Sequence, residues 1–172
     1  DVFASADTAN MTKAVRAGLI ASDPVNFATN VLTIVVPPGN PANIASLTDL
    51  ARPDVTVVVC APQVPCGTAT QKIEDATGVR LTPVSEESSV TDVLGKVVTG
   101  QADAGLVYVT DAAGAGDKVV EVPFPEAARV VNTYPIAVLN KSGNPETATD
   151  FVGFVAGTEG RAVLSDAGFG AP

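Results

Sequence analysis

Hydrophobic positions recur with a helical period in one stretch of the chain. Between Ser89 and Gly100 the apolar residues fall at i, i+3, i+4, i+7 and i+8, and they are Val90, Val93, Leu94, Val97 and Val98. Ser89 and Asp92 have the spacing of a capping box, and Gly100 suits the position just past a helix C-terminus. The pattern therefore predicts a helix that begins at Val90 and has a single apolar stripe.

A second pattern, a β-branched run at Val55–Val59, predicts a strand whose two faces are both covered, as in a parallel sheet. A turn with two prolines follows at 61–65, and a helix entered through Pro65, Cys66 and Gly67 ends at Gly78. Further strands are predicted at 1–6, 31–36, 79–84, 104–109, 119–122 and 134–139. Residues 85–89 are expected to form a polar loop.

Other helices are predicted at 7–17, in a short turn after Ser46, at 145–157 and at 158–167. We expect Met11 and Val15 to share one face of the first of these. In the last two we expect these side chains to pack inward: Phe151, Val152, Phe154 and Val155. Because strands and helices alternate, the sequence predicts an α/β fold with mostly parallel sheets flanked by helices.

Composition excludes several classes of partner. The chain has 172 residues, 46% of them hydrophobic, enough for one sizeable core or two small lobes. Its net charge is −9, and its 10 Lys and Arg are scattered singly, so we expect no nucleic-acid partner and no cationic membrane-surface helix. Its apolar runs are far shorter than the roughly 20 residues of a membrane-spanning helix.

The absence of histidine removes the commonest general base and the commonest zinc ligand. An enzyme would then depend on Cys66 as a nucleophile at a helix N-terminus, or on a carboxylate pair such as Glu86 and Glu87. The two glutamates are more simply explained as part of a solvated loop. We therefore predict that the protein is not an enzyme and has no cofactor and no direct metal ligand.

Cys60 and Cys66 are the only cysteines, too few for a structural zinc site and not spaced as C-x-x-C. We favour a disulfide between them over two free thiols or two small buried hydrophobes. Closing so short a loop contributes about 2 kcal/mol and indicates an oxidising compartment outside the cytoplasm.

Three features converge at the carboxyl ends of the predicted strands, where α/β sheets bind ligands. They are the helix N-terminus at Cys66 and Gly67, the helix N-terminus at Ser89 and Val90, and the hydroxyl of Tyr108. Free N–H groups and the positive end of the helix dipole suit an oxyanion held by neutral donors. The alternative for Tyr108 is a core tyrosine with a satisfied hydroxyl.

Five segments carry a resemblance to a known family: DVFASAD at 1–7, VPCG at 64–67, the helix from Val90, GLVYVTD at 105–111 and YPIAV at 134–138. In order and spacing the chain resembles periplasmic molybdate-binding proteins from end to end. These proteins are substrate-capturing subunits of ABC importers with a two-lobed type II periplasmic-binding-protein fold. The resemblance implies one lobe at 34–133 and another formed by 1–33 with 134–172.

By the same resemblance, the oxyanion ligands in the lobe 34–133 are the N–H of Cys66, the N–H of Val90 and the Tyr108 hydroxyl. The ligand is molybdate or tungstate, so metal arrives only as the oxyanion. The protein would be exported to the periplasm or the outer face of the membrane, and would deliver its ligand to the ABC permease. An N-terminal lipid anchor is one way such proteins stay at the membrane.

Two departures from the family bear on the site. Position 66 is commonly alanine, and cysteine is acceptable there because the donor is the main-chain N–H. The family's first-lobe ligands lie on a strand-helix-strand segment before the DVFASAD motif, so we expect the lobe of 1–33 with 134–172 to be incomplete at its N-terminus. Residues 1–172 alone are accordingly expected to bind molybdate weakly.

Selectivity leaves alternatives open. Neutral donors without a carboxylate suit a fully ionised dianion, whereas protonated phosphate needs an acceptor for its proton. Sulfate differs from molybdate only in size, so a binding protein for sulfate or another oxyanion is one alternative. A ligand-sensing domain of a transcription regulator is the other, and a disulfide would argue against its cytosolic location.

Overall fold

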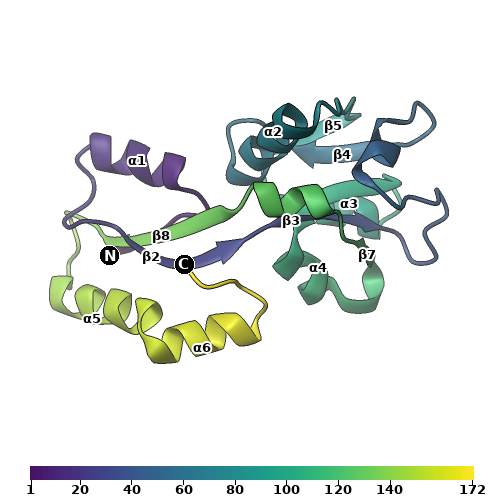
Figure 1. Cartoon of the computed structure of the whole chain (residues 1–172). Helices are drawn as coiled ribbons and strands as arrows, with labels where there is room; N and C mark the ends of the chain where they lie inside the picture. Colours follow the sequence, from purple (N-terminus) through teal and green to yellow (C-terminus); the bar gives the residue numbers. More distant parts are fainter. The chain divides into compact units, whose positions relative to one another are not determined.

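The computed structural model describes residues 1–172 and divides into two compact units (Figure 1). The terminal unit consists of Asp1–Asn30 and Asn132–Pro172, and the central unit of Val31–Val131. The family resemblance implied boundaries at 33/34 and 133/134. That each unit carries one half of a ligand site stays a prediction.

The terminal unit is built on a three-stranded sheet in the order β1, β8, β2. The strands are β1 (Val2–Ala4), β8 (Asn132–Val138) and β2 (Val25–Asn30), and both pairings are antiparallel. Its helices are α1 (Thr8–Arg16), α5 (Pro145–Ala156) and α6 (Thr158–Asp166). Figure 1 shows α1 on one side of this sheet and α5 and α6 on the other.

The N-terminal helix begins as its sequence predicts, but the inward face predicted for α5 is partly wrong. Asp7 caps α1 by accepting the Asn10 N–H at 2.7 Å. Met11 is buried, whereas Val15 is 45% exposed. In α5 the side that lies inward carries Ala148, Val152 and Val155, at i, i+4 and i+7.

Phe151 and Phe154 flank that side of α5 and are 52% and 51% exposed. The prediction that they pack inward is therefore wrong. Because α5 is so apolar, more than one of its faces carries apolar residues three or four positions apart. In the structure, the buried face is the one with the smaller side chains.

The central unit contains a five-stranded sheet in the order β5, β4, β6, β3, β7. The strands are β5 (Ser85–Glu87), β4 (Val57–Cys60), β6 (Ala104–Tyr108), β3 (Leu32–Val36) and β7 (Val120–Val122). Its helices are α2 (Pro65–Thr77), α3 (Val90–Val98) and α4 (Val109–Ala115). Short 3₁₀ helices lie at Leu47–Ala51, Gly116–Lys118 and Pro125–Arg129. Every residue of β3, β4 and β6 is buried.

The α/β class is confirmed, but the sheets are less parallel than predicted. Only β4 with β5 and β4 with β6 are parallel pairs. Strands joined through an α-helix do run in one direction: β1 and β2 through α1, and β6 and β7 through α4. However, β8 lies between β1 and β2, and β3 lies between β6 and β7. Each of these two strands is antiparallel to both of its neighbours. Neither inserted strand is reached through an α-helix, so no crossover constrains its direction.

Three local predictions also need correction. Residues 79–84 do not form a strand; Pro83 interrupts them, and the Val84 N–H alone reaches β4, at the Val57 carbonyl (2.9 Å). The strand lies one step later, at β5, in the stretch predicted as a polar loop. Strand β2 and helix α4 were not predicted. None of the helices has the length and apolar character needed to cross a membrane.

Candidate functional site

Three helices begin at one edge of the central sheet. Because β4, β5 and β6 are parallel, their carboxyl ends lie at the same edge, with Cys60 opposite Glu87 and Val58 opposite Gly105. Helices α2, α3 and α4 each follow one of these strands. We call this edge, where their N-termini begin, the carboxyl edge. It is where open α/β sheets bind ligands.

Helix α2 presents unpaired backbone donors at this edge. Its N-cap is Val64, which makes no side-chain cap bond, and Pro65 is the first helical residue. Thr68 is the first residue whose N–H bonds back into the helix, to the Val64 carbonyl at 2.9 Å. The N–H groups of Cys66 and Gly67 are therefore among those that a helix leaves without an intrahelical partner.

The turn before α2 requires glycine at position 67. A Cβ built on Gly67 would lie 1.9 Å from the carbonyl oxygen of Ala61. The turn is also closed by the Val64 N–H, which donates to Ala61 at 3.1 Å, and by Thr68 Oγ1, which donates to the Pro62 carbonyl at 2.9 Å. The backbone around Cys66 is thus held tightly against the end of β4.

The predicted disulfide between Cys60 and Cys66 is confirmed. It joins the last residue of β4 to the second residue of α2, and the two cysteines are 2% and 4% exposed. The chain has no free cysteine. The alternative in which Cys66 serves as a nucleophile therefore lacks its thiol, and the bond fixes residue 66 to the strand.

Helix α3 begins at the same edge, as its sequence predicts. Ser89 Oγ accepts the Asp92 N–H at 3.2 Å and donates to Asp92 Oδ2 at 2.7 Å. Val90 is the first helical residue and is half-buried. Along the predicted stripe, Val93 and Val97 are buried and Val98 is exposed. Gly100 has a positive φ of 71°, the conformation that a residue past a helix end commonly adopts.

Tyr108 ends β6 at the carboxyl edge and is 4% exposed. Its N–H donates to Asp111 Oδ2 at 3.0 Å, and the next N–H, of Val109, donates to the Val31 carbonyl at 3.1 Å. Burial raises the pKa of Asp111, while the hydrogen bond from the Tyr108 N–H lowers it. Sequence reasoning missed this half-buried carboxylate. Its signal was the spacing, because an acidic residue three positions after an N-cap often reaches back to the N-cap N–H.

Glu86 and Glu87, the carboxylate pair of the enzyme alternative, lie on opposite faces of the sheet. Glu86 and Glu87 are consecutive residues of β5, so their side chains point to opposite faces. Glu87 accepts a hydrogen bond from Lys96, which also donates to Ser85 Oγ at 3.0 Å. The hydrogen bonds from Lys96 and then Ser85 lower the pKa of Glu87. Glu87 is therefore an ion-paired carboxylate and does not form an acid–base pair with Glu86.

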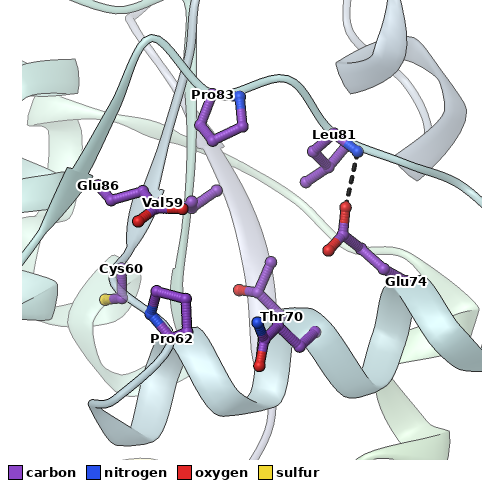
Figure 2. A pocket seen from close by; sticks show the side chains of 10 residues that line it. Val59, Cys60, Pro62, Thr70, Glu74, Leu81, Pro83 and Glu86 are labelled. Carbon is purple, nitrogen blue, oxygen red and sulfur yellow. Dashed lines mark hydrogen bonds between the residues drawn. The ribbon is translucent and has the colours of Figure 1, made fainter.

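A cavity of about 100 Å³ lies along the flank of α2, and Figure 2 shows the residues that line it. Thr70 and Glu74 face it from the helix, Leu81 and Pro83 from the following loop. Glu74 Oε1 accepts the Leu81 N–H at 2.7 Å and holds that loop to α2. The lining includes two carboxylates, Glu74 and Glu86, whose negative charge would repel an oxyanion, so this cavity does not suit one.

Nor does the structure bring together three or more His, Cys, Asp or Glu side chains that could hold a metal ion. The donors at the carboxyl edge are neutral: backbone N–H groups and a phenol. Such groups suit an anion and not a cation.

Comparison with known proteins identifies the family. The model of a family described as bacterial extracellular solute-binding protein matches residues 1–170. The chain therefore belongs to this family. It is 59% identical over 172 residues to the molybdate-binding protein ModA of Mycobacterium bovis, covering 100% of this chain and 66% of that protein. This solute-binding protein thus spans slightly less than two thirds of the length of that relative.

Solved structures agree on the fold of this solute-binding protein. The Azotobacter vinelandii periplasmic molybdate-binding protein matches with a TM-score of 0.81 at 21% identity, covering 100% of this chain and 78% of that chain. The sulfate-binding protein SubI of Mycobacterium tuberculosis matches with a TM-score of 0.83 at 23% identity, covering 98% and 68%. At these identities the likeness shows the fold alone, so it does not choose between the two anions.

Proposed function

We propose that this protein is the substrate-binding subunit of an ABC importer and that it captures molybdate or tungstate. One observation carries the proposal: the 59% identity with a molybdate-binding protein extends over all 172 residues. The aligned region therefore spans the carboxyl edge as well as the core residues that maintain the fold.

The proposed ligands are the N–H of Cys66, the N–H of Val90 and the hydroxyl of Tyr108. The first two belong to helix N-termini, where the aligned peptide dipoles are equivalent to roughly half a positive charge. The disulfide and the close contact of Gly67 support this proposal, because they hold the Cys66 N–H in a fixed place. Preorganised donors bind an anion more tightly than mobile ones.

The chemistry of these donors supports a fully ionised dianion. All three donate hydrogen bonds in the proposed site, and two of them, the backbone N–H groups, can only donate, so a proton kept by the oxyanion would compete with the donated bonds. Molybdate and tungstate are dianions at neutral pH, whereas phosphate is partly protonated. Sulfate differs from them in size and is the alternative to be tested.

We propose a binding role without catalysis or a cofactor, with the metal present only as its oxyanion. Support comes from the disulfide, which occupies the sulfur of Cys66, and from Lys96, which is bonded to Glu87. The proposed partners are the permease subunits of the importer, and the proposed location is the periplasm or the outer face of the membrane. A family of extracellular proteins and a disulfide both agree with an oxidising location. Attachment by an N-terminal lipid anchor is part of the same proposal.

Titration calorimetry with molybdate, tungstate, sulfate and phosphate tests the proposal. The chain is titrated alone and preceded by the segment that the family resemblance leads us to expect before Asp1. We expect molybdate and tungstate to bind more tightly than sulfate, and phosphate to bind least. Tighter binding of sulfate, or no heat from any of the four anions in either form, would overturn the assignment.

A further inference from the structure

A half-buried carboxylate lies behind Tyr108 at the carboxyl edge. Asp111 is the third residue of α4, and its Oδ2 accepts the Tyr108 N–H at 3.0 Å. The bond spans the point where β6 becomes α4, which is also where the side chain of Tyr108 leaves the backbone. Asp111 therefore restrains the one residue of the proposed site that would bind through its side chain.

No cation offsets the charge of Asp111. The elements packed against α4 are α3, β3, β6 and the short helix Gly116–Lys118. Their charged residues are Asp92, Lys96, Asp117 and Lys118, and none of them contributes to the shift in the pKa of Asp111. Lys96 is instead bonded to Glu87. A partly desolvated carboxylate without a cation is costly, and it would also repel a nearby anion.

We propose that Asp111 is a positioning residue of the oxyanion site: by holding the Tyr108 N–H it orients the Tyr108 hydroxyl toward the bound anion. The proposal rests on the proposed function and deepens it. A tyrosine hydroxyl lies at the far end of a long, rigid side chain, so a small rotation of the backbone at Tyr108 displaces it beyond hydrogen-bonding distance. A hydrogen bond across the strand–helix junction prevents that rotation.

Two substitutions distinguish the hydrogen bond that Asp111 accepts from the negative charge that it carries. Asparagine at this position keeps an oxygen that accepts the Tyr108 N–H, but it carries no negative charge. Alanine removes the acceptor altogether. If positioning is the role, Asp111→Asn should bind molybdate at least as tightly as the unmodified protein, whereas Asp111→Ala should bind it about tenfold more weakly.

Asp49→Ala is the matched control. Asp49 also accepts a backbone N–H at 3.0 Å, from Ala45, in the short helix Leu47–Ala51 that precedes β4 and so lies toward the amino ends of the parallel strands. Asp49→Ala therefore removes a carboxylate that accepts a backbone N–H, as Asp111→Ala does, but at a place away from the carboxyl edge. We expect molybdate affinity in Asp49→Ala to be unchanged.

A double-mutant cycle with Tyr108→Phe tests whether Asp111 acts through the Tyr108 hydroxyl. Once that hydroxyl is absent, Asp111→Ala should cause no further loss of affinity. A full tenfold loss when Asp111→Ala is added to Tyr108→Phe, a loss in Asp111→Asn as large as in Asp111→Ala, or an equal loss in Asp49→Ala would each overturn the proposal.

The ring resonances of Tyr108 provide a measurement that needs no ligand. The chain has two tyrosines, so Tyr108→Phe assigns these signals in an isotope-labelled sample. They should move in Asp111→Ala and stay in place in Asp111→Asn; signals that are unmoved in the alanine variant would refute positioning. If the unmodified protein binds no oxyanion while the signals behave as expected, the proposed function fails and the positioning by Asp111 stands. If Asp111→Ala does not fold, a tenfold loss of affinity in Asp111→Asn still refutes the proposal.

Discussion

Tyr108→Phe is the substitution that most directly tests the proposed site. It deletes one hydroxyl and keeps the ring, which is 4% exposed and belongs to the core of the central unit. The backbone bond from the Tyr108 N–H to Asp111 does not involve the hydroxyl and should persist. The variant therefore isolates the contribution of a single donor.

The expected loss follows from the charge of the ligand. A hydrogen bond to a charged group contributes about 1.5 to 3 kcal/mol, which corresponds to a dissociation constant roughly 10 to 150 times larger. The lower limit applies if a water molecule replaces the hydroxyl at the anion. A core tyrosine without a ligand role would lose at most the bond that its hydroxyl makes within the fold, which would change stability and leave affinity alone.

Calorimetric titration with molybdate, alongside thermal unfolding, separates these outcomes. Tyr134→Phe is the control, because Tyr134 is the other tyrosine of the chain and belongs to the terminal unit, where its ring lies 6.2 Å from that of Phe27. We expect weaker binding by a folded Tyr108→Phe variant, and unchanged binding in Tyr134→Phe. An unchanged dissociation constant in Tyr108→Phe would refute the role of its hydroxyl as a ligand.

Three further predictions concern the framework of the central unit. Non-reduced, denatured protein should take up no alkylating agent by mass, and Cys60→Ser with Cys66→Ser should lower stability by about 2 kcal/mol; two adducts would exclude the disulfide. Gly67→Ala should destabilise by several kcal/mol in urea, because its Cβ meets the Ala61 carbonyl, whereas Gly95→Ala, in helix α3 with open space around it, should be neutral or stabilising by up to about 1 kcal/mol. Glu87 has a pKa lowered from its ordinary value of 4.5, so its ion pair stabilises the fold above that pH and is lost as pH falls through the lowered pKa. Lys96→Met should therefore be destabilising at pH 7 and less so at pH 3, while Arg80→Met, which breaks a pair exposed on both sides, should change little at either pH.

The sequence predicted best where local and tertiary signals agree. In helix α3 the Ser89 side chain caps the N-terminus, Val93 and Val97 of the apolar stripe are buried, and Gly100 past the end has a positive φ. The junction from β4 to α2 was predicted for the same reason, since prolines and Gly67 allow few other conformations. Two of the three proposed ligands lie at these helix N-termini.

Strand order and direction were not predictable, because they depend on pairing between distant segments. Nothing in Leu32–Val36 or Asn132–Val138 indicates that each inserts between two strands that run the other way. In β2 the buried side chains are Ala28 and Asn30 while Phe27 is only partly buried, so hydrophobicity gives no strand signal. Strand β5 consists of Ser-Glu-Glu, and it is held at the sheet edge by backbone pairing with β4 and by the polar contacts of Lys96 with Ser85 and Glu87.

The overall charge of the protein constrains how such a site must work. The net charge of −9 would repel an approaching dianion at long range, so electrostatic steering by the net charge would not account for the proposed capture of molybdate or tungstate. Affinity must then come from short-range donors that are fixed before the anion arrives. The carboxyl edge has three such restraints: the disulfide at Cys66, the Ser89 cap beside Val90, and the hydrogen bond that the Tyr108 N–H donates to Asp111. Each restraint acts on the backbone next to one proposed ligand, so the cost of ordering the donors is met during folding and not during binding.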